Sequence, residues 1–399
     1  MLNVDKSKTY LLACSFGPDS MALFSLLMEN QIKFEVAHVN YHLRKESDDE
    51  EAGLRAYCEQ NNVKIHVLNV KETIEHNVEG RCREIRYDFF AKLCHENVFA
   101  AVLVAHQEDD LIETYLLQKI RKNLVNYYGI KELTTIKDTI IIRPLLTYTK
   151  KDLEQLCNNR KVPYAIDQSN LTKAYKRNQI RIDVVSKLTE VERRAILKEI
   201  NEKNHSLSFV LDKISKLDNK IDTLCALSSD ELAYYLYSKV SAIKPNYQLT
   251  HKCVNEVMKL MHSNKPNIIM IIARDVVIEK AYDELIVRAK NKEQSYSFLI
   301  EKPCELDNEY FYLDFRGNTS NRNVSLDDYP LTIRTYKKGD TYLIKDYQVP
   351  VRRLFIDWKM PLALRKRWPI ILDKDNKIIY IPRYRKDFKI DPVPNFYVK

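Results

Sequence analysis

The sequence predicts an α/β protein with an N-terminal parallel sheet, a helical middle region and a small α+β C-terminal domain. Up to Ala105, short apolar runs alternate with helical stretches. Between residues 187 and 262, Leu, Lys and Glu recur at helical spacing, and after Ser295 runs rich in Tyr, Ile and Val are broken by Pro and Gly. A chain of 399 residues also exceeds what one hydrophobic core usually serves, so two or three domains are expected.

Four apolar runs predict the strands of the N-terminal sheet, at residues 10–14, 34–39, 65–70 and 100–105. The segments between them are long enough for crossover helices, which predicts parallel strands. Ligands of such sheets bind beyond the carboxyl ends of the strands. Polar clusters follow three of the four runs, at residues 15–20, 38–44 and 106–110. Their convergence on one edge predicts a binding site there.

The rest of the chain divides by composition. The lysine-rich stretch 290–295 is expected to be a linker, and strands are expected at residues 310–315, 331–336 and 377–382. We therefore expect three domains, at residues 1–190, 191–289 and 290–399.

Positive charge is concentrated near the C-terminal end. The formal net charge is +9, and residues 331–399 hold 17 Lys and Arg against 7 Asp and Glu. This excess favours a polyanionic partner. The eight cysteines form no Cys-x-x-Cys pair and have no His at ligand spacing, which argues against zinc, an iron–sulfur cluster or a disulfide framework.

No segment of the sequence is suited to a membrane. The longest apolar stretches are too short to cross a bilayer, and the first residues lack the apolar core of a secretory signal. We therefore expect a soluble cytoplasmic protein.

A phosphate site is predicted where the first strand meets the first helix. Residues 15–20 read Ser-Phe-Gly-Pro-Asp-Ser and lead into a helical pattern. The start of a helix offers N–H groups and partial positive charge to an anion. Hydroxyls of Ser15 and Ser20 can donate to phosphate oxygens, and Asp19 is placed to hold Mg²⁺. The alternative is structural, with Ser15 capping a helix and Asp19 favouring its first turn.

A second candidate is the acidic helix start that follows His106. Asp109, Asp110 and Glu113 fall within one helical turn, and Asp110 and Glu113 share a face at spacing i, i+3. Acidic residues at this place often only complement the helix dipole. Facing a triphosphate across the crevice, the same carboxylates could instead share a Mg²⁺ ion.

Basic clusters follow in the first half of the chain. Arg83 and Arg86 either lie on a solvated helix face or approach phosphates of a nucleotide or RNA. Residues 167–170 form a turn-type segment before a basic helix start, where Arg177 and Arg181 are one turn apart. Such a segment is suited to ordering around an anion.

Near the C-terminal end, cations alternate with aromatic residues, a pattern suited to RNA backbone contact and base stacking. The alternative is a basic surface without a function. The candidate contacts are Arg352, Arg353, Arg365, Lys366 and Arg367.

Together these motifs resemble the tRNA(Ile)-lysidine synthetase family of the N-type ATP pyrophosphatase (PP-loop) superfamily. The motif at residues 15–20 marks only the superfamily. The block at residues 167–181 and the elements at 334–340 and 349–353 are more particular to the family. The resemblance therefore covers both ends of the chain.

The resemblance implies an RNA-modifying ligase built on a Rossmann-like sheet. ATP would activate the wobble cytidine of a CAU-anticodon tRNA(Ile) with release of pyrophosphate, and free L-lysine would then displace AMP to give lysidine. ATP and Mg²⁺ are the implied cofactors. Residues 1–190 would be catalytic, and residues 191–289 and 290–399 would contact the tRNA. A homodimer is compatible with the family, although the sequence contains no self-association motif.

Carried over residue by residue, the resemblance implies catalysis by Asp19, Asp110 and Arg177, with Asp19 and Asp110 also holding the metal. The residues implied in ATP binding are Ser15, Phe16, Gly17, Pro18, Asp19, Ser20, His38 and His106. The residues implied in substrate binding are Arg83, Arg86, Glu113, Arg181, Arg352, Arg353, Arg365, Lys366 and Arg367.

Two positions depart from the family pattern. Phe16 stands where the family has Gly, so either this residue adopts an ordinary conformation or the loop is shaped differently. Gln107 stands where a second His is common, and the change would remove an adenine-side or structural contact.

Three other functions fit parts of the sequence. A tRNA thiolase of the same superfamily commonly uses cysteine pairs, and this sequence has none. A small-molecule synthetase would not need a basic C-terminal domain. A nonenzymatic RNA-binding protein on a decayed nucleotide fold would not be expected to retain Asp19, Asp110 and Glu113.

Overall fold

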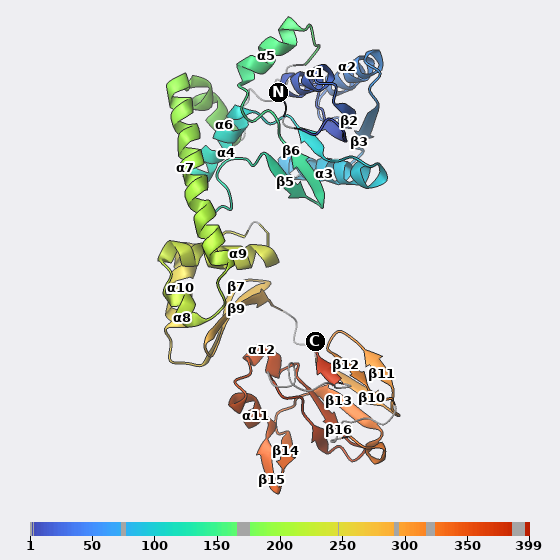
Figure 1. Cartoon of the computed structure of the whole chain (residues 1–399), viewed down its shortest axis with the longest axis vertical. Helices are drawn as coiled ribbons and strands as arrows, with labels where there is room; N and C mark the ends of the chain where they lie inside the picture. Colours follow the sequence, from blue (N-terminus) through green and yellow to red (C-terminus); the bar gives the residue numbers. More distant parts are fainter. Residues whose placement is uncertain are drawn as a thin grey trace. The chain divides into compact units, whose positions relative to one another are not determined.

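The computed structural model describes residues 2, 4–72, 77–165, 176–245, 247–290, 295–316, 324–384 and 396–399. Contacts between residues divide the chain into two compact units, Met1–Phe209 and Val210–Lys399. Figure 1 shows the two units along the chain. The finer division at residues 190 and 290 stays a prediction.

The first unit contains a six-stranded sheet in the order β3-β2-β1-β4-β6-β5. All neighbouring pairs are parallel except the edge pair β5–β6. The strands are β1 (Thr9–Ala13), β2 (Lys33–Asn40), β3 (Ile65–Asn69), β4 (Val102–Val104), β5 (Leu133–Ile136) and β6 (Thr139–Ile142). The predicted parallel sheet is confirmed, and β1 to β4 lie at the four predicted apolar runs. Strands β5 and β6 were not predicted.

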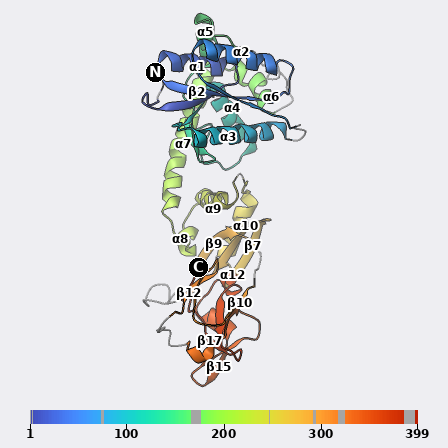
Figure 2. The same cartoon turned by 90° about the vertical axis from the view of Figure 1, so that its right-hand side faces the viewer.

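Helices cover both faces of this sheet because alternate strand residues point to opposite sides. Leu12 of β1 packs in one core with α1 (Pro18–Glu29), α2 (Ser47–Gln60) and α5 (Lys150–Asn159). Leu11, its neighbour, packs in a second core with α3 (Val78–Glu96). Figure 2 shows α1 and α2 on one side of the sheet and α3 on the other.

Four further elements complete the first unit at the carboxyl edge of the sheet. They are α4 (Glu108–Arg121), α6 (Lys176–Asp183), the 3₁₀ turn η2 (Val185–Lys187) and the first part of α7 (Glu190–Ser215). Ile112 of α4, Ile180 of α6 and Val185 form a small buried cluster. This cluster holds the basic helix α6 against the acidic start of α4.

The second unit begins with the end of α7 and three more helices, α8 (Ile221–Cys225), α9 (Ser229–Ile243) and α10 (His251–Met261). The predicted helical pattern is therefore present. The region is not only helical, however, because β7 (Asn267–Ala273), β8 (Val276–Ala281) and β9 (Glu284–Ala289) form an antiparallel sheet. Runs of Ile and Val favour strands over helices here.

The C-terminal part combines small sheets and short helices around one core. Strands β10 (Ser297–Ile300), β13 (Leu331–Thr335), β16 (Pro369–Leu372) and β17 (Ile378–Tyr380) form its largest sheet. Buried Phe311, Phe355 and Trp368 fill the core. The other elements are β11 (Glu305–Asp307), β12 (Phe311–Asp314), η3 (Leu326–Asp328), β14 (Thr341–Ile344), β15 (Tyr347–Pro350), α11 (Val351–Asp357), α12 (Leu362–Arg365) and β18 (Phe396–Val398).

This arrangement confirms the predicted α+β character of the C-terminal region.

Among the described residues, none of the helices combines the length and the apolar character that a bilayer crossing requires.

Candidate active site

The loop between β1 and α1 leads into a helix start that no side chain caps. Pro18 at its first turn has no N–H group. The hydroxyl of Ser20 accepts a hydrogen bond from the N–H of Ser15 at 3.3 Å and donates to the carbonyl of Gly17 at 3.0 Å. Ser20 therefore closes the loop in this structure, whereas Ser15 is exposed at its rim.

Phe16 adopts the left-handed backbone conformation, with φ at 64°. Gly17, which follows it, has an ordinary φ of −78° and serves as the N-cap residue of α1. An ordinary conformation of Phe16, one of the two outcomes expected from the sequence, is therefore wrong. The loop makes its left-handed turn one residue before the glycine, and the Phe16 side chain is buried.

His38 reaches the same loop from β2. Its Nδ1 lies 2.9 Å from the carbonyl oxygen of Cys14 and its side chain is buried. Burial lowers the pKa of His38, which favours a neutral ring that donates from Nδ1. In the described structure, His38 ties the end of β1 to β2.

The start of α4 is closed by a capping box. The side-chain oxygen of Gln107 accepts from the N–H of Asp109 at 2.7 Å, and Asp110 Oδ2 accepts from the N–H of Gln107 at 3.1 Å. Gln107 thus supplies a structural contact at the position where the family commonly has His.

Asp110 and Glu113 hold the arginines of α6. Glu113 is fully buried, and its Oε2 accepts from Arg177 Nε and from Arg181 Nη2, each at 2.9 Å. Arg177 Nη2 also donates to Asp110 Oδ1 at 2.9 Å. The two pairs predicted separately from the sequence therefore form one network.

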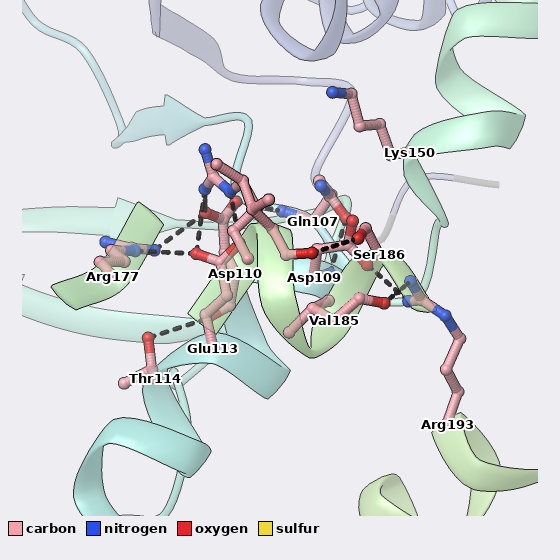
Figure 3. A network of polar contacts seen from close by, with 12 residues as sticks. Gln107, Asp109, Asp110, Glu113, Thr114, Lys150, Arg177, Val185, Ser186 and Arg193 are labelled. Carbon is pink, nitrogen blue, oxygen red and sulfur yellow. Dashed lines mark hydrogen bonds and ion pairs between the residues drawn. The ribbon is translucent and has the colours of Figure 1, made fainter. Parts of the chain in front are cut away.

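A second arginine contact lies on the other side of the same helix start. Arg193 of α7 donates to Glu108 at 3.2 Å and to Asp109. Figure 3 shows Arg177 and Arg193 approaching the first turn of α4 from opposite sides. Sequence reasoning missed Glu108 and Arg193, because nothing in their spacing predicts contact across 85 residues.

Asp19 faces the Asp110 network from the start of α1. Within the described chain, its Oδ1 is buried without a hydrogen-bond partner. Burial, reinforced by the negative charge of Asp110, raises the pKa of Asp19 to about 7, although Lys150 and Arg181 offset part of the effect. A half-buried carboxylate with one buried oxygen, beside a second carboxylate, would be stabilised by a bound cation.

The pair Asp19 and Asp110 suits Mg²⁺ better than a metal held by protein alone. No group of three or more His, Cys, Asp and Glu side chains suited to a metal occurs in the described ranges. Mg²⁺ does not need one, because it commonly binds one or two carboxylates and completes its shell with phosphate oxygens and water. The two carboxylates therefore fit a Mg²⁺ ion that arrives with a triphosphate.

His106 is surrounded by arginines from other parts of the first unit. Its Nδ1 accepts from Arg143 Nε at 3.0 Å. Burial, together with the charges of Arg143 and Arg177 and more weakly of Arg83 and Arg86, lowers the pKa of His106 to about 3. His106 is thus a neutral hydrogen-bond acceptor surrounded by positive charge. The arginines that α3 and α6 contribute to this group are suited to binding an anion.

Arg83 and Arg86 lie on α3 within this environment. The Arg83 guanidinium lies over the Tyr87 ring at 4.8 Å, beside a surface cavity of about 500 Å³ that Lys137 also lines. Arg86 Nε donates to the hydroxyl of Tyr41 at 3.4 Å. Arg143, which follows β6, joins them although it was not among the predicted site residues. The signal available in the sequence was the segment Arg143-Pro144-Leu145-Leu146, which matches the family pattern.

The predicted C-terminal cations differ in their surroundings. Arg352, Arg353, Lys366 and Arg367 are exposed, and Arg353 pairs with Asp357 on its own helix. Arg365 is partly buried and donates to the Met360 carbonyl and the Tyr282 hydroxyl, each at 3.0 Å. Arg365 is therefore anchored within the fold by its own hydrogen bonds. The predicted segment 167–170 lies outside the described residues.

Two known domain families match the chain. A PP-loop domain matches residues 1–188, and a TilS substrate C-terminal domain matches residues 331–391. Among solved structures, the U34-tRNA thiolase NcsA from Methanococcus maripaludis aligns with 50% of this chain and 74% of its own, at 16% identity and a TM-score of 0.43.

Curated relatives match along nearly the whole chain. The tRNA(Ile)-lysidine synthase of Mycoplasma mycoides subsp. mycoides SC is 31% identical over 402 residues, which cover 95% of this chain and 98% of the relative. The enzyme of the same name from Staphylococcus aureus strain N315 is 29% identical, covering 93% of this chain and 92% of its own. That of Mesoplasma florum is 29% identical, covering 84% and 90%. The chain belongs to the tRNA(Ile)-lysidine synthase family.

Proposed function

We propose that this protein ligates lysine to the wobble cytidine of a CAU-anticodon tRNA(Ile) in two steps. First, the O2 atom of the cytosine forms a bond to the α-phosphorus of ATP, and pyrophosphate leaves. Then the neutral side-chain amine of lysine attacks C2, AMP leaves with O2, and the nitrogen loses a proton to give lysidine.

The observation that supports this proposal most directly is the pairing of Asp19 with Asp110. The two carboxylates come from the helix starts that follow β1 and β4, which are neighbours in the sheet. The unpartnered Asp19 oxygen and the raised pKa of this residue indicate a site that is incomplete without a cation. Mg²⁺ held by these two residues would neutralise phosphate charge and polarise the group under attack.

The residues around the pair suit the departure of an anion. Arg177 and Arg181 are fixed by the buried Glu113, so their orientation is set before a substrate binds. Guanidinium groups bind phosphate oxygens in a fork that lysine cannot reproduce. We assign Arg177 to stabilising charge on the leaving pyrophosphate and Arg181 to positioning Asp110 and Glu113.

The loop that follows β1 would bind the triphosphate. Ser15 offers an exposed hydroxyl, and the first turn of α1 offers backbone N–H groups free of a side-chain cap. His38 and Ser20 would keep the loop in shape through their bonds to Cys14, Ser15 and Gly17. No covalent enzyme nucleophile is needed, so catalysis rests on positioning and charge.

The exposed cations of the C-terminal region would bind the tRNA backbone. Arg352, Lys366 and Arg367 are exposed, as a phosphate contact requires. ATP, free lysine and tRNA occur together in the cytoplasm, where we place the protein. A homodimer stays a prediction that sedimentation of the purified protein would test.

An incorporation assay tests the proposed reaction. The purified protein is incubated with CAU-anticodon tRNA(Ile), ATP, Mg²⁺ and labelled lysine, and we expect labelled tRNA together with one AMP and one pyrophosphate per lysine. The Asp110→Asn variant and a methionine tRNA with the same anticodon serve as controls. A folded wild-type protein that incorporates no lysine would refute the proposal, and incorporation of labelled sulfur would indicate a thiolase.

A further inference from the structure

We propose that Gly53, in the middle of α2, is a positioning residue that sets the shape of the phosphate loop through the ring of Phe16. The inference rests on the proposed function, because it assumes that this loop binds ATP. Gly53 lies 33 residues beyond the end of the 15–20 motif, in a helix that supplies none of the predicted site residues.

The contact between the two residues leaves no room for a β-carbon. A Cβ at position 53 would lie 2.8 Å from Phe16 Cζ and 2.9 Å from Phe16 Cε1. Real Cβ atoms essentially never approach carbon this closely, since carbon atoms in contact are about 3.5–4.0 Å apart. The Phe16 ring is only 8% exposed, so it is packed into the space that the missing Cβ provides.

A glycine at this position is otherwise unfavourable. The interior of a helix disfavours Gly relative to Ala, because Gly loses more backbone freedom on folding. Gly53 also has no need of special backbone freedom, since α2 is regular from Ser47 to Gln60. Of the ways in which a glycine can matter here, close approach of a neighbouring side chain is the one that the structure shows.

Phe16 in turn transmits the contact to the phosphate loop. Its φ of 64° is costly for a residue with a side chain, so surrounding contacts must hold it. One of these is the ring packing on Gly53, and the other is the Phe16 carbonyl, which accepts from the N–H of Ala165 at 2.9 Å. Moving the ring away from α2 would therefore turn the backbone between Ser15 and Gly17, where the triphosphate would bind.

A double-mutant cycle tests this coupling. The four proteins are the wild type, Gly53→Ala, Phe16→Gly and Phe16→Gly/Gly53→Ala. For each, the dissociation constant of Mg²⁺-ATP is measured by calorimetry, and the KM values for ATP and for lysine are measured in the incorporation assay. Ala52→Gly, at the neighbouring position of the same helix, controls for a change in helix propensity.

We expect Gly53→Ala to weaken ATP binding and to raise the KM for ATP about fivefold or more, with the KM for lysine unchanged. In the Phe16→Gly background the ring is absent, so the same substitution should change ATP binding by less than about twofold. The double variant should also fold if Gly53→Ala alone does not, because the clash is gone and Ala favours the helix.

The outcomes separate this inference from the proposed function. Equal effects of Gly53→Ala in both backgrounds would overturn the inference, and so would a loss of thermal stability without any change in ATP binding. A wild-type protein that binds ATP but incorporates no lysine would refute only the proposed function. A wild-type protein that does not bind ATP would overturn both.

Discussion

Arg177 donates from Nη2 to Oδ1 of Asp110 at 2.9 Å, while its Nε donates to the buried Glu113 at the same distance. One guanidinium therefore joins the proposed metal-binding carboxylate to a carboxylate that has no access to solvent. The arginine fork balances two negative charges and keeps both oxygens oriented.

The first prediction concerns this fork. Arg177→Lys keeps the charge but cannot bond both carboxylates in the same plane, so we expect pyrophosphate release in a single turnover to slow about 10–100-fold. The affinity for tRNA, measured by filter binding, should change by less than about threefold. Arg194→Lys, on the exposed face of α7, is the matched control. An adenylation rate that survives Arg177→Lys would show that the fork is only structural.

A second prediction separates two adjacent acids of α4. Asp110→Asn should abolish adenylation, because the carboxylate is assigned to the metal. The affinity for tRNA should stay nearly intact, because the amide oxygen of Asn can still accept the hydrogen bond from the Gln107 N–H that caps α4. Asp109→Asn breaks the ion pair with Arg193, so it should lower the free energy of unfolding by about 1 kcal/mol and leave adenylation measurable. Loss of tRNA binding with adenylation retained in Asp110→Asn would show that the assignment is wrong.

Local patterns were enough to predict four of the six strands of the sheet and the acidic residues at its edge. Alternating apolar runs fixed β1 to β4, and the i, i+3 spacing of Asp110 and Glu113 placed them on one face of α4. The meeting of Glu113 with Arg177 and Arg181 was not predicted, because 64 and 68 residues separate them and no local pattern links them.

Two of the features that sequence reasoning missed depend on packing. Gly53 carries no signal of its own in α2, and its role becomes visible only when the Phe16 ring is placed against it. Arg365 looked like its neighbours in the basic run, but bonds to Met360 and Tyr282 give it an anchoring role. The β7–β9 sheet was missed for another reason: the helical pattern ends at residue 262, and the Ile and Val runs after it are a local strand signal that the domain assignment did not use.

The third prediction follows from this difference between the C-terminal cations. Replacing exposed Lys366 and Arg367 by Gln should weaken tRNA binding and reduce the slope of log K against log salt by about one for each phosphate that is no longer neutralised. Lys302→Gln, also in the second unit and exposed, is a control for charge alone. An unchanged slope would relocate the RNA contact.

Arg365→Ala should behave differently from that pair. It removes hydrogen bonds to Met360 and Tyr282, so we expect a loss of about 1–2 kcal/mol in the free energy of unfolding, measured by urea denaturation. A stable Arg365→Ala variant with a reduced salt slope would instead assign Arg365 to the tRNA.

The last prediction uses the raised pKa of Asp19. In the folded protein its pKa is about 7, against a usual value of 3.8, so between pH 4 and pH 7 the folded chain holds a proton that the unfolded chain has lost. This residue therefore makes folding less favourable as the pH rises through that window, and the penalty is complete above about pH 7. Asp19→Asn removes this penalty.

Without nucleotide, we expect the Asp19→Asn variant to gain stability relative to wild type by about 2 kcal/mol between pH 5 and pH 8, measured by urea denaturation. With Mg²⁺-ATP the order should reverse at pH 8, because the ligand would stabilise only the protein that keeps the carboxylate. A stability difference that does not grow with pH would show that Asp19 is not held in the buried, charge-repelled environment on which the metal assignment depends.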